Sequence, residues 1–300
     1  MATTETGSHA LTAGEQVVAA VGRSTQLGLV LRAQLAGGGR PVRRIRWYFE
    51  VLLAVAGYLI YAEARTLHGK DPQAYIGTAA RHGQDLFDFE KAIHIDWEKG
   101  LQHVLLPYKG FLQVVGGFYG GAHFVVTIGV LVWMLIKRPQ FYRFWRSALF
   151  LLTMTAVGIF ALFPAMPPRL LEDSNGHTIT VDTLDTVGGL WSYNHGVIER
   201  ISDGYAPMPS LHLGWATWVA LSLFFTLPAR SWGRKIVVIF YPLAVYFTVI
   251  ATGTHFVIDG VAGMALTGAV VMIFAFIVVK YRKRRLERES ASAASSSAPA

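Results

Sequence analysis

The stretch FVIDGVAGMALTGAVVMIFAFIVVKYRKRR, residues 256–285, decides the fold class of this chain. Its first part, residues 256–279, has a single charged side chain, Asp259, and is long enough to cross a bilayer core about 30 Å thick as one helix. Five of the six residues that follow are Lys or Arg, which are retained in the cytoplasm when they flank a span. The stretch therefore predicts a transmembrane helix with a cytoplasmic C-terminal end.

Five segments further upstream are also apolar enough to cross a membrane. The chain of 300 residues is 53% hydrophobic and 15% charged, whereas soluble domains carry about 25% charged residues. The six predicted spans are residues 47–61, 111–136, 147–163, 210–227, 236–251 and 256–279. We therefore expect an all-α integral membrane protein with six transmembrane helices and a membrane domain at residues 41–284.

Basic residues cluster before the first span, between the second and third, between the fourth and fifth, and after the sixth. All four clusters then fall on one side, which predicts that both termini are cytoplasmic. We expect a cytoplasmic N-terminal segment at residues 1–40 and a disordered cytoplasmic tail at residues 285–300, rich in small residues and serine at its end. The protein should be multi-pass, in the plasma membrane or another cell membrane.

The charge pattern argues against a nucleic-acid partner, and the composition excludes cysteine chemistry. The net charge of +8 comes from short clusters between apolar runs and not from a basic folded surface, which argues against nucleic acid as a partner. The chain has no cysteine, so disulfides and thiolate catalysis are excluded.

The segment between the first two predicted spans, residues 62–107, is too polar to cross a membrane. Apolar residues are nevertheless spread through it at the spacing of one or two amphipathic helices. We expect an interfacial helical cap on the outer face of the membrane.

Three short stretches place polar groups where a membrane helix should avoid them, at residues 164–169, 208–212 and 252–259. The predicted topology brings all three to the non-cytoplasmic surface, so we expect them to form one site. Their candidate side chains are Arg169, Ser210, His212, His255 and Asp259.

The last of these stretches supplies a candidate nucleophile. If Gly253 and Thr254 start the sixth helix, His255 and Asp259 are four residues apart on one helical face. A carboxylate that reaches the imidazole fixes its tautomer and leaves the other ring nitrogen free to attack.

The other two stretches supply groups suited to a phosphate. Pro209 fits the first turn of a helix, which places Ser210 and His212 near a helix N-terminus, where backbone N–H groups and the helix dipole attract anions. Arg169 offers a planar fork of donors to two phosphate oxygens. His212 is then placed to protonate a leaving oxygen as general acid.

These motifs resemble those of the type-2 phosphatidic acid phosphatase superfamily, over roughly residues 75–275. The matching motifs are His-x-x-x-Asp at His255 and Asp259, and Pro-Ser-x-His at residues 209–212. The resemblance implies a six-helix core, a nucleophilic His255 that forms a phosphohistidine, a general-acid His212 and no metal or other cofactor. It also implies phosphate binding by Ser210 and by Arg169 of a Pro-Pro-Arg stretch.

Within that superfamily the chain resembles the branch of inositol phosphorylceramide synthase, an inositolphosphotransferase. The phosphatase-like branch has a lysine seven residues before the first-motif arginine and Ser-Arg before the nucleophile, where this chain has Leu162, Thr248 and Val249. The resemblance thus implies a lipid-phosphate phosphatase or phosphotransferase among membrane lipids, which transfers a phosphoryl or phosphoinositol group and has a polyol such as inositol as a candidate acceptor.

Three further residues are candidates for the site: His123 inside the second span, and His195 and Arg200 in the outer loop. Two other classes stay open. A metal-dependent membrane hydrolase would use His212, His255 and Asp259 as ligands. A non-catalytic transporter would carry polar residues along the spans, whereas here they concentrate at one surface. A serine hydrolase is disfavoured because Ser210 lacks the Gly-x-Ser-x-Gly elbow.

Overall fold

The computed structural model describes residues 47–66, 72–173, 176–187, 208–228 and 232–296. The chain divides into two units, Met1–Val42 and Arg43–Ala300, and every described residue belongs to the second. The predicted cytoplasmic segment at residues 1–40 therefore lies outside the described residues. The helices are α2 (Trp47–Thr66), α3 (Pro72–Ala92), α4 (Glu98–Leu105), α5 (Lys109–Lys137), α6 (Pro139–Leu162), α7 (Thr183–Thr186), α9 (Leu211–Thr226), α10 (Trp232–Ala251) and α11 (Val257–Ser296).

The regular secondary structure of the described residues is helical, apart from one isolated β-bridge between Glu172 and Thr178, which confirms the all-α prediction for this part of the chain. Four helices within it are long and apolar enough to cross a membrane: α5, α6, α10 and the part of α11 at Val257–Ser290. The apolar parts of α2 and α9 are shorter, at Tyr48–Gly57 and Leu211–Thr226. Four of the six predicted spans thus correspond to helices that are long and apolar enough to cross a membrane, and the number of six spans stays a prediction.

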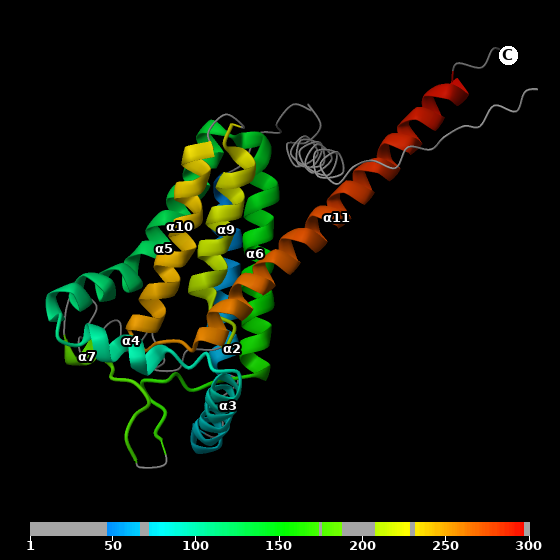
Figure 1. The fold of residues 1–300 in the computed structure, drawn as a ribbon. Coiled ribbons are helices and arrows are strands. Elements are labelled where there is room, and N and C mark those ends of the chain that lie inside the picture. Colours follow the sequence, from blue (N-terminus) through cyan, green and yellow to red (C-terminus); the bar gives the residue numbers. More distant parts are fainter. Residues whose placement is uncertain (1–46, 67–71, 174–175, 188–207, 229–231, 297–300) are drawn as a thin grey trace, which may run out of the picture. The chain divides into compact units, whose positions relative to one another are not determined.

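Helix α9 lies at the centre of the bundle and packs against α5, α6, α10 and α11 (Figure 1). Its length of 16 residues corresponds to about 24 Å, less than a bilayer core. Its apolar residues are nevertheless spread around its whole circumference, as expected for a helix that faces protein on all sides. At its N-terminal end α11 approaches so closely that a Cβ on Gly263 would clash with the carbonyl oxygen of Ser210.

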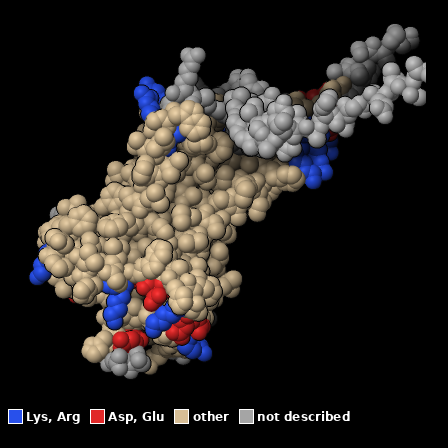
Figure 2. Space-filling model, in the orientation of Figure 1, with Lys and Arg blue, Asp and Glu red and all other residues tan. Residues whose placement is uncertain are grey.

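Large apolar side chains cover the outward faces of the long helices. They include Val125, Ile128 and Ile136 of α5, Val237 and Phe240 of α10, and Met272 and Phe276 of α11. Figure 2 shows a broad uncharged band on this face, with charged side chains gathered at its ends. Exposed apolar surface on this scale would be costly in water, so its solvent is lipid and the chain is a membrane protein.

The segment between α2 and α5 forms the two helices expected of the cap. Helix α3 packs against the stretch that follows α6, where Met166 N–H donates to the Ala79 carbonyl at 2.9 Å, and the ring of His82 stacks on Phe163. Helix α4 packs against α10 and α5. The helical part of the cap prediction is confirmed, and its location at the outer membrane face stays a prediction.

The end of α11 differs from expectation. Residues 285–300 are predicted as a disordered tail, but α11 continues as a helix to Ser296. Extending an existing helix adds one hydrogen bond for each residue ordered and avoids the cost of nucleation. The Arg285–Glu289 ion pair, with Nε and Oε1 at 2.8 Å, supports this turn at helical spacing. Composition alone therefore failed to predict this helix because it ignores the span that precedes it.

Candidate active site

The turn between α10 and α11 does not start α11 as predicted. Thr254 N–H donates to the Val249 carbonyl and Gly253 N–H to the Ile250 carbonyl, which together close the end of α10. Gly253 has a φ of +67° there, and a Cβ on it would lie 2.5 Å from Thr180 Oγ1. The expectation that Gly253 and Thr254 begin the last helix is therefore wrong, because Gly253 is the left-handed residue that ends the preceding one.

His255 and Asp259 nevertheless meet as the sequence predicts. Helix α11 begins at Val257, so His255 precedes it and Asp259 is its third residue. His255 Nδ1 lies 3.3 Å from Asp259 Oδ2, and the two residues are 3% and 1% exposed. The same carboxylate oxygen accepts the Phe256 N–H at 3.1 Å, as an acid at this position of a helix often does. This contact orients the imidazole and leaves Nε2 for other chemistry.

The start of α9 brings Ser210 and His212 to the same place. Helix α9 begins at Leu211 and Ser210 is its N-cap residue, so Pro209 lies before the helix and not in its first turn as expected. Ser210 is 1% exposed, and its Oγ makes no cap bond and has no hydrogen-bond partner among the described residues. A buried hydroxyl without a partner is costly, which is consistent with a group kept for a ligand.

The rings of three histidines form a cluster. The His212 ring centroid lies 5.7 Å from that of His255 and 4.3 Å from that of His123. The ring of Tyr119 also stacks on His212, with their centroids 4.5 Å apart. The structure thus brings the candidate His123 into contact with His212, through a face of α5 that also presents Tyr119.

The backbone ties the three stretches together. Ser210 N–H donates to the Asp259 carbonyl at 3.1 Å, which joins the starts of α9 and α11. Arg169 N–H donates to the Gly253 carbonyl at 3.2 Å, which joins the stretch after α6 to the turn before His255. The predicted convergence of residues 164–169, 208–212 and 252–259 is therefore observed.

The side chain of Arg169 already has an anionic partner. Its Nη1 donates to Asp182 Oδ2 in an ion pair, and Arg169 is 7% exposed. The other oxygen of Asp182 accepts the N–H groups of Leu184 and Asp185 and so caps the short helix α7. Asp182 is not among the site residues predicted from the sequence. The pair is not readable from the sequence because it depends on how the loop folds back.

Two buried acids of the cap were also missed. Glu98 Oε1 accepts the Val257 N–H and Glu90 Oε1 accepts the Ile258 N–H, each at 2.7 Å. Burial and the charge of Glu98 raise the pKa of Glu90 to about 9, and burial raises the pKa of Glu98 as well. In an amphipathic cap such acids are expected to face water, so the pattern gave no signal for their burial.

Gln102 of α4 links two further parts of the site. Its Nε2 donates to the carbonyls of Val181 and Ala251, and its Oε1 accepts the Val181 N–H at 2.8 Å. It thereby joins the residue before Asp182 to the end of α10.

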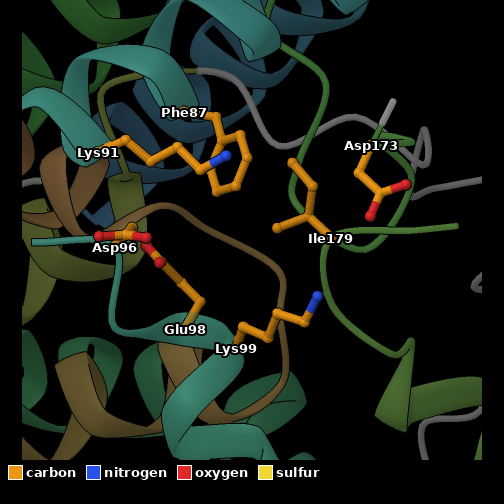
Figure 3. Close-up of a pocket in the computed structure, with 7 residues that line it drawn as sticks. All are labelled: Phe87, Lys91, Asp96, Glu98, Lys99, Asp173 and Ile179. Carbon is orange, nitrogen blue, oxygen red and sulfur yellow. The ribbon is translucent and has the colours of Figure 1, made fainter. Parts of the chain in front are cut away.

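A cavity of about 130 Å³ lies beside the cap and not at the histidine cluster (Figure 3). Figure 3 shows Asp96, Glu98 and Lys99 along one side of it, and Ile179 and Asp173 on another. The predicted site residues do not line it. Two remaining candidates, His195 and Arg200, lie outside the described residues. Within the described ranges, no group of three or more His, Asp or Glu side chains is arranged to hold a metal ion.

Comparison with known proteins identifies the family. A sequence model of the PAP2 superfamily matches residues 84–274, which include the end of α3, all of α4 and all three stretches of the site. Searches of curated proteins and of solved structures find no significant match. The match covers more than half of the chain and confirms the superfamily that the motifs resemble. This chain belongs to the PAP2 superfamily, and it is an enzyme of phosphoric-ester hydrolysis or phosphoryl transfer that acts on lipid phosphates.

Proposed function

We propose that this enzyme attacks the phosphorus of a lipid phosphate with His255 Nε2 and passes through a phosphohistidine. The observation that supports this most is the buried contact between His255 Nδ1 and Asp259 Oδ2 at 3.3 Å, with the His212 ring 5.7 Å from that of His255. A bond forms between Nε2 and phosphorus while the bond from phosphorus to the leaving oxygen breaks. His212 donates a proton to that oxygen.

The second half of the reaction reverses these roles. Water or an alcohol attacks the phosphohistidine, His212 accepts its proton, and the bond between phosphorus and His255 breaks. Asp259 stabilises the positive charge that His255 carries as a phosphohistidine, because its carboxylate stays in contact with Nδ1.

Phosphate binding is assigned to the start of α9 and to Arg169. The unpartnered Oγ of Ser210 and the first N–H groups of α9 can donate to phosphate oxygens, and the helix dipole favours the negative charge. Arg169 can donate from its planar fork once a phosphate competes with Asp182 for it. A backbone contact supports this assignment: the Arg169 N–H donates to the carbonyl of Gly253, which is two residues before His255 in the sequence.

We further propose transfer to an alcohol in preference to hydrolysis. The lysine and the arginine of the phosphatase-like branch are replaced here by Leu162, which is 82% exposed, and by Val249, which is buried within α10. This difference supports the resemblance to the synthase branch, whose reaction is transfer. A phosphoryl or phosphoinositol group would then pass to a second lipid or to a polyol such as inositol.

The site is proposed to face the non-cytoplasmic side. It lies at the N-terminal ends of α9 and α11, whereas the basic cluster of α11 follows its apolar part. A reporter fused after Val279 should be cytoplasmic, and a tag inserted near Asn175 should be accessible from outside. A cytoplasmic tag near Asn175 would reverse the orientation.

The test of the function is mass spectrometry of the products formed by the purified enzyme from a panel of phospholipids, with and without inositol. We expect activity that persists in chelator, is blocked by vanadate and is lost in His255→Ala. Activity that chelator abolishes and zinc or magnesium restores would favour the metal-dependent class. A product that contains the added inositol establishes transfer, and free phosphate as the product establishes hydrolysis.

A further inference from the structure

Two carboxyl groups from the cap reach the first turn of α11. Glu90 comes from the end of α3 and Glu98 from the start of α4, and they are 0% and 1% exposed. They accept the N–H groups of Ile258 and Val257, which lie about 160 residues away in the sequence. The cap is therefore bonded to the helix that carries Asp259.

Three carboxyl groups at this turn each accept one of its N–H donors. Asp259 accepts the Phe256 N–H, Glu98 the Val257 N–H and Glu90 the Ile258 N–H. These N–H groups have no partner within a helix, and unpaired they would be costly in a buried turn. Tyr246 of α10 completes the contacts by donating its hydroxyl to the Val257 carbonyl at 2.6 Å. The backbone next to His255 is thus held from α3, α4 and α10.

Neutral side chains would be expected at this position if packing alone were needed. Two buried acids side by side repel each other when both are charged, and their burial carries a further cost. Burial, with the charges of Glu98 and Asp259, raises the pKa of Glu90 to about 9, so Glu90 is protonated at neutral pH. Glu90 therefore binds the turn as a neutral group.

We propose that Glu90 and Glu98 are positioning residues, which hold the first turn of α11 and thereby keep His255 and Asp259 aligned with the phosphate. The inference rests on the proposed function, because alignment has a catalytic meaning only if His255 attacks phosphorus. Neither acid touches the substrate. Each acts through the backbone N–H that it accepts, and the turn transmits that constraint to the imidazole.

The test compares Glu90→Ala, Glu98→Ala and the two Gln variants in the full chain reconstituted in lipid nanodiscs. Each Gln retains an oxygen that can accept the same N–H, so it should restore what Ala loses. Asp85→Asn is the matched control, since Asp85 is an exposed acid of the same helix α3. Two readouts are taken: steady-state kinetics on a lipid phosphate, and hydrogen exchange of the peptide that contains Val257 and Ile258.

We expect both Ala variants to exchange these amides faster and to lower kcat by about 10²-fold with little change in KM, the scale expected when a reactive group is misplaced by about 1 Å. The Gln variants and the control should stay near wild type in both. Faster exchange with unchanged kcat would overturn the positioning role, and unchanged exchange would overturn the contact itself.

The exchange readout also separates this proposal from the function on which it rests. If wild-type protein forms no phosphoenzyme, the proposed function fails, and exchange still reports whether the acids hold the turn. If an Ala variant does not fold, kcat and hydrogen exchange are measured on the Gln variant of the same residue instead. A Gln variant that folds and keeps slow amide exchange but loses kcat to the extent expected for Ala would overturn the positioning role, because the contact to the turn is then intact.

Discussion

The N-termini of α9 and α11 lie side by side in the site, and they differ in whether side chains bond to their first N–H groups. At α9 the N-cap Ser210 makes no cap bond, and its Oγ has no partner among the described residues. At α11 three carboxyl groups accept the N–H groups of residues 256–258. The comparison shows how one kind of structure serves two purposes. An open N-terminus can receive an anion, whereas an N-terminus whose first N–H groups already bond to carboxyl groups does not offer them to an anion and is held in place instead.

The largest expected effect separates His255 beside α11 from His212 on α9. His255→Ala should form no phosphoenzyme with any substrate, because the attacking nitrogen is gone. His212→Ala should be slower by about 10²–10⁴-fold on a lipid phosphate, yet be rescued in part by nitrophenyl phosphate, whose leaving group needs no proton. The measurement is phosphoenzyme yield and turnover on both substrates, with His103→Ala, an exposed residue of α4, as control. An acid-labile phosphohistidine on His212 would mean that the two roles are reversed.

The next effect tests whether the open end of α9 binds phosphate. Ser210→Ala removes a donor to a charged oxygen, worth about 1.5–3 kcal/mol, so kcat/KM should fall by about 10–150-fold. Ser222→Ala is the matched control, because Ser222 lies on the same helix and donates to the Val219 carbonyl. Vanadate inhibition should weaken in Ser210→Ala and not in the control. Equal kinetics in the two variants would remove Ser210 from the phosphate site.

A smaller effect is expected at the acid that holds Arg169. Asp182→Asn removes the negative charge and keeps an oxygen that can cap α7, so Arg169 should become more available to phosphate. Because Asp182 is partly exposed, the gain should be at most about 1 kcal/mol, or about fivefold tighter inhibition by vanadate. Asp185→Asn, an exposed neighbour, serves as control. Weaker inhibition in Asp182→Asn would instead show that Asp182 is needed to orient the guanidinium.

The last prediction concerns the stability of the fold at the N-terminus of α11 and not catalysis. The pKa of Glu90 is about 9 in the folded protein against an ordinary value of 4.5, because of burial and the neighbouring charges of Glu98 and Asp259. The stabilisation that depends on its proton is complete below pH 4.5 and is lost as the pH rises toward 9. Glu90→Gln has no proton to lose. The thermal unfolding midpoint of wild type should therefore fall more steeply between pH 5 and 9 than that of the variant. Parallel slopes would show that Glu90 is not protonated there.

Much of the fold and most of the site were predictable from local pattern. Four long apolar helices and a helical cap follow from the length and spacing of apolar residues, which constrain each helix by itself. The pairing of His255 with Asp259 was predicted from a spacing of four residues, although it arises in a turn and not on a helical face. Gly253 was misread because a glycine can mark either the start of one helix or the end of another.

By itself, the sequence determined that lipid is the solvent of this protein and that the stretches at residues 164–169, 208–212 and 252–259 converge. Both could be predicted because hydropathy and short motifs are local properties of the chain. Only the tertiary structure decided that Asp182 holds Arg169, that His123 contacts His212, and that two acids of the cap hold the start of α11. These contacts join residues separated by up to 168 positions. Whether such an acid faces water or a buried N–H depends on how the cap packs, since its own sequence is compatible with both environments.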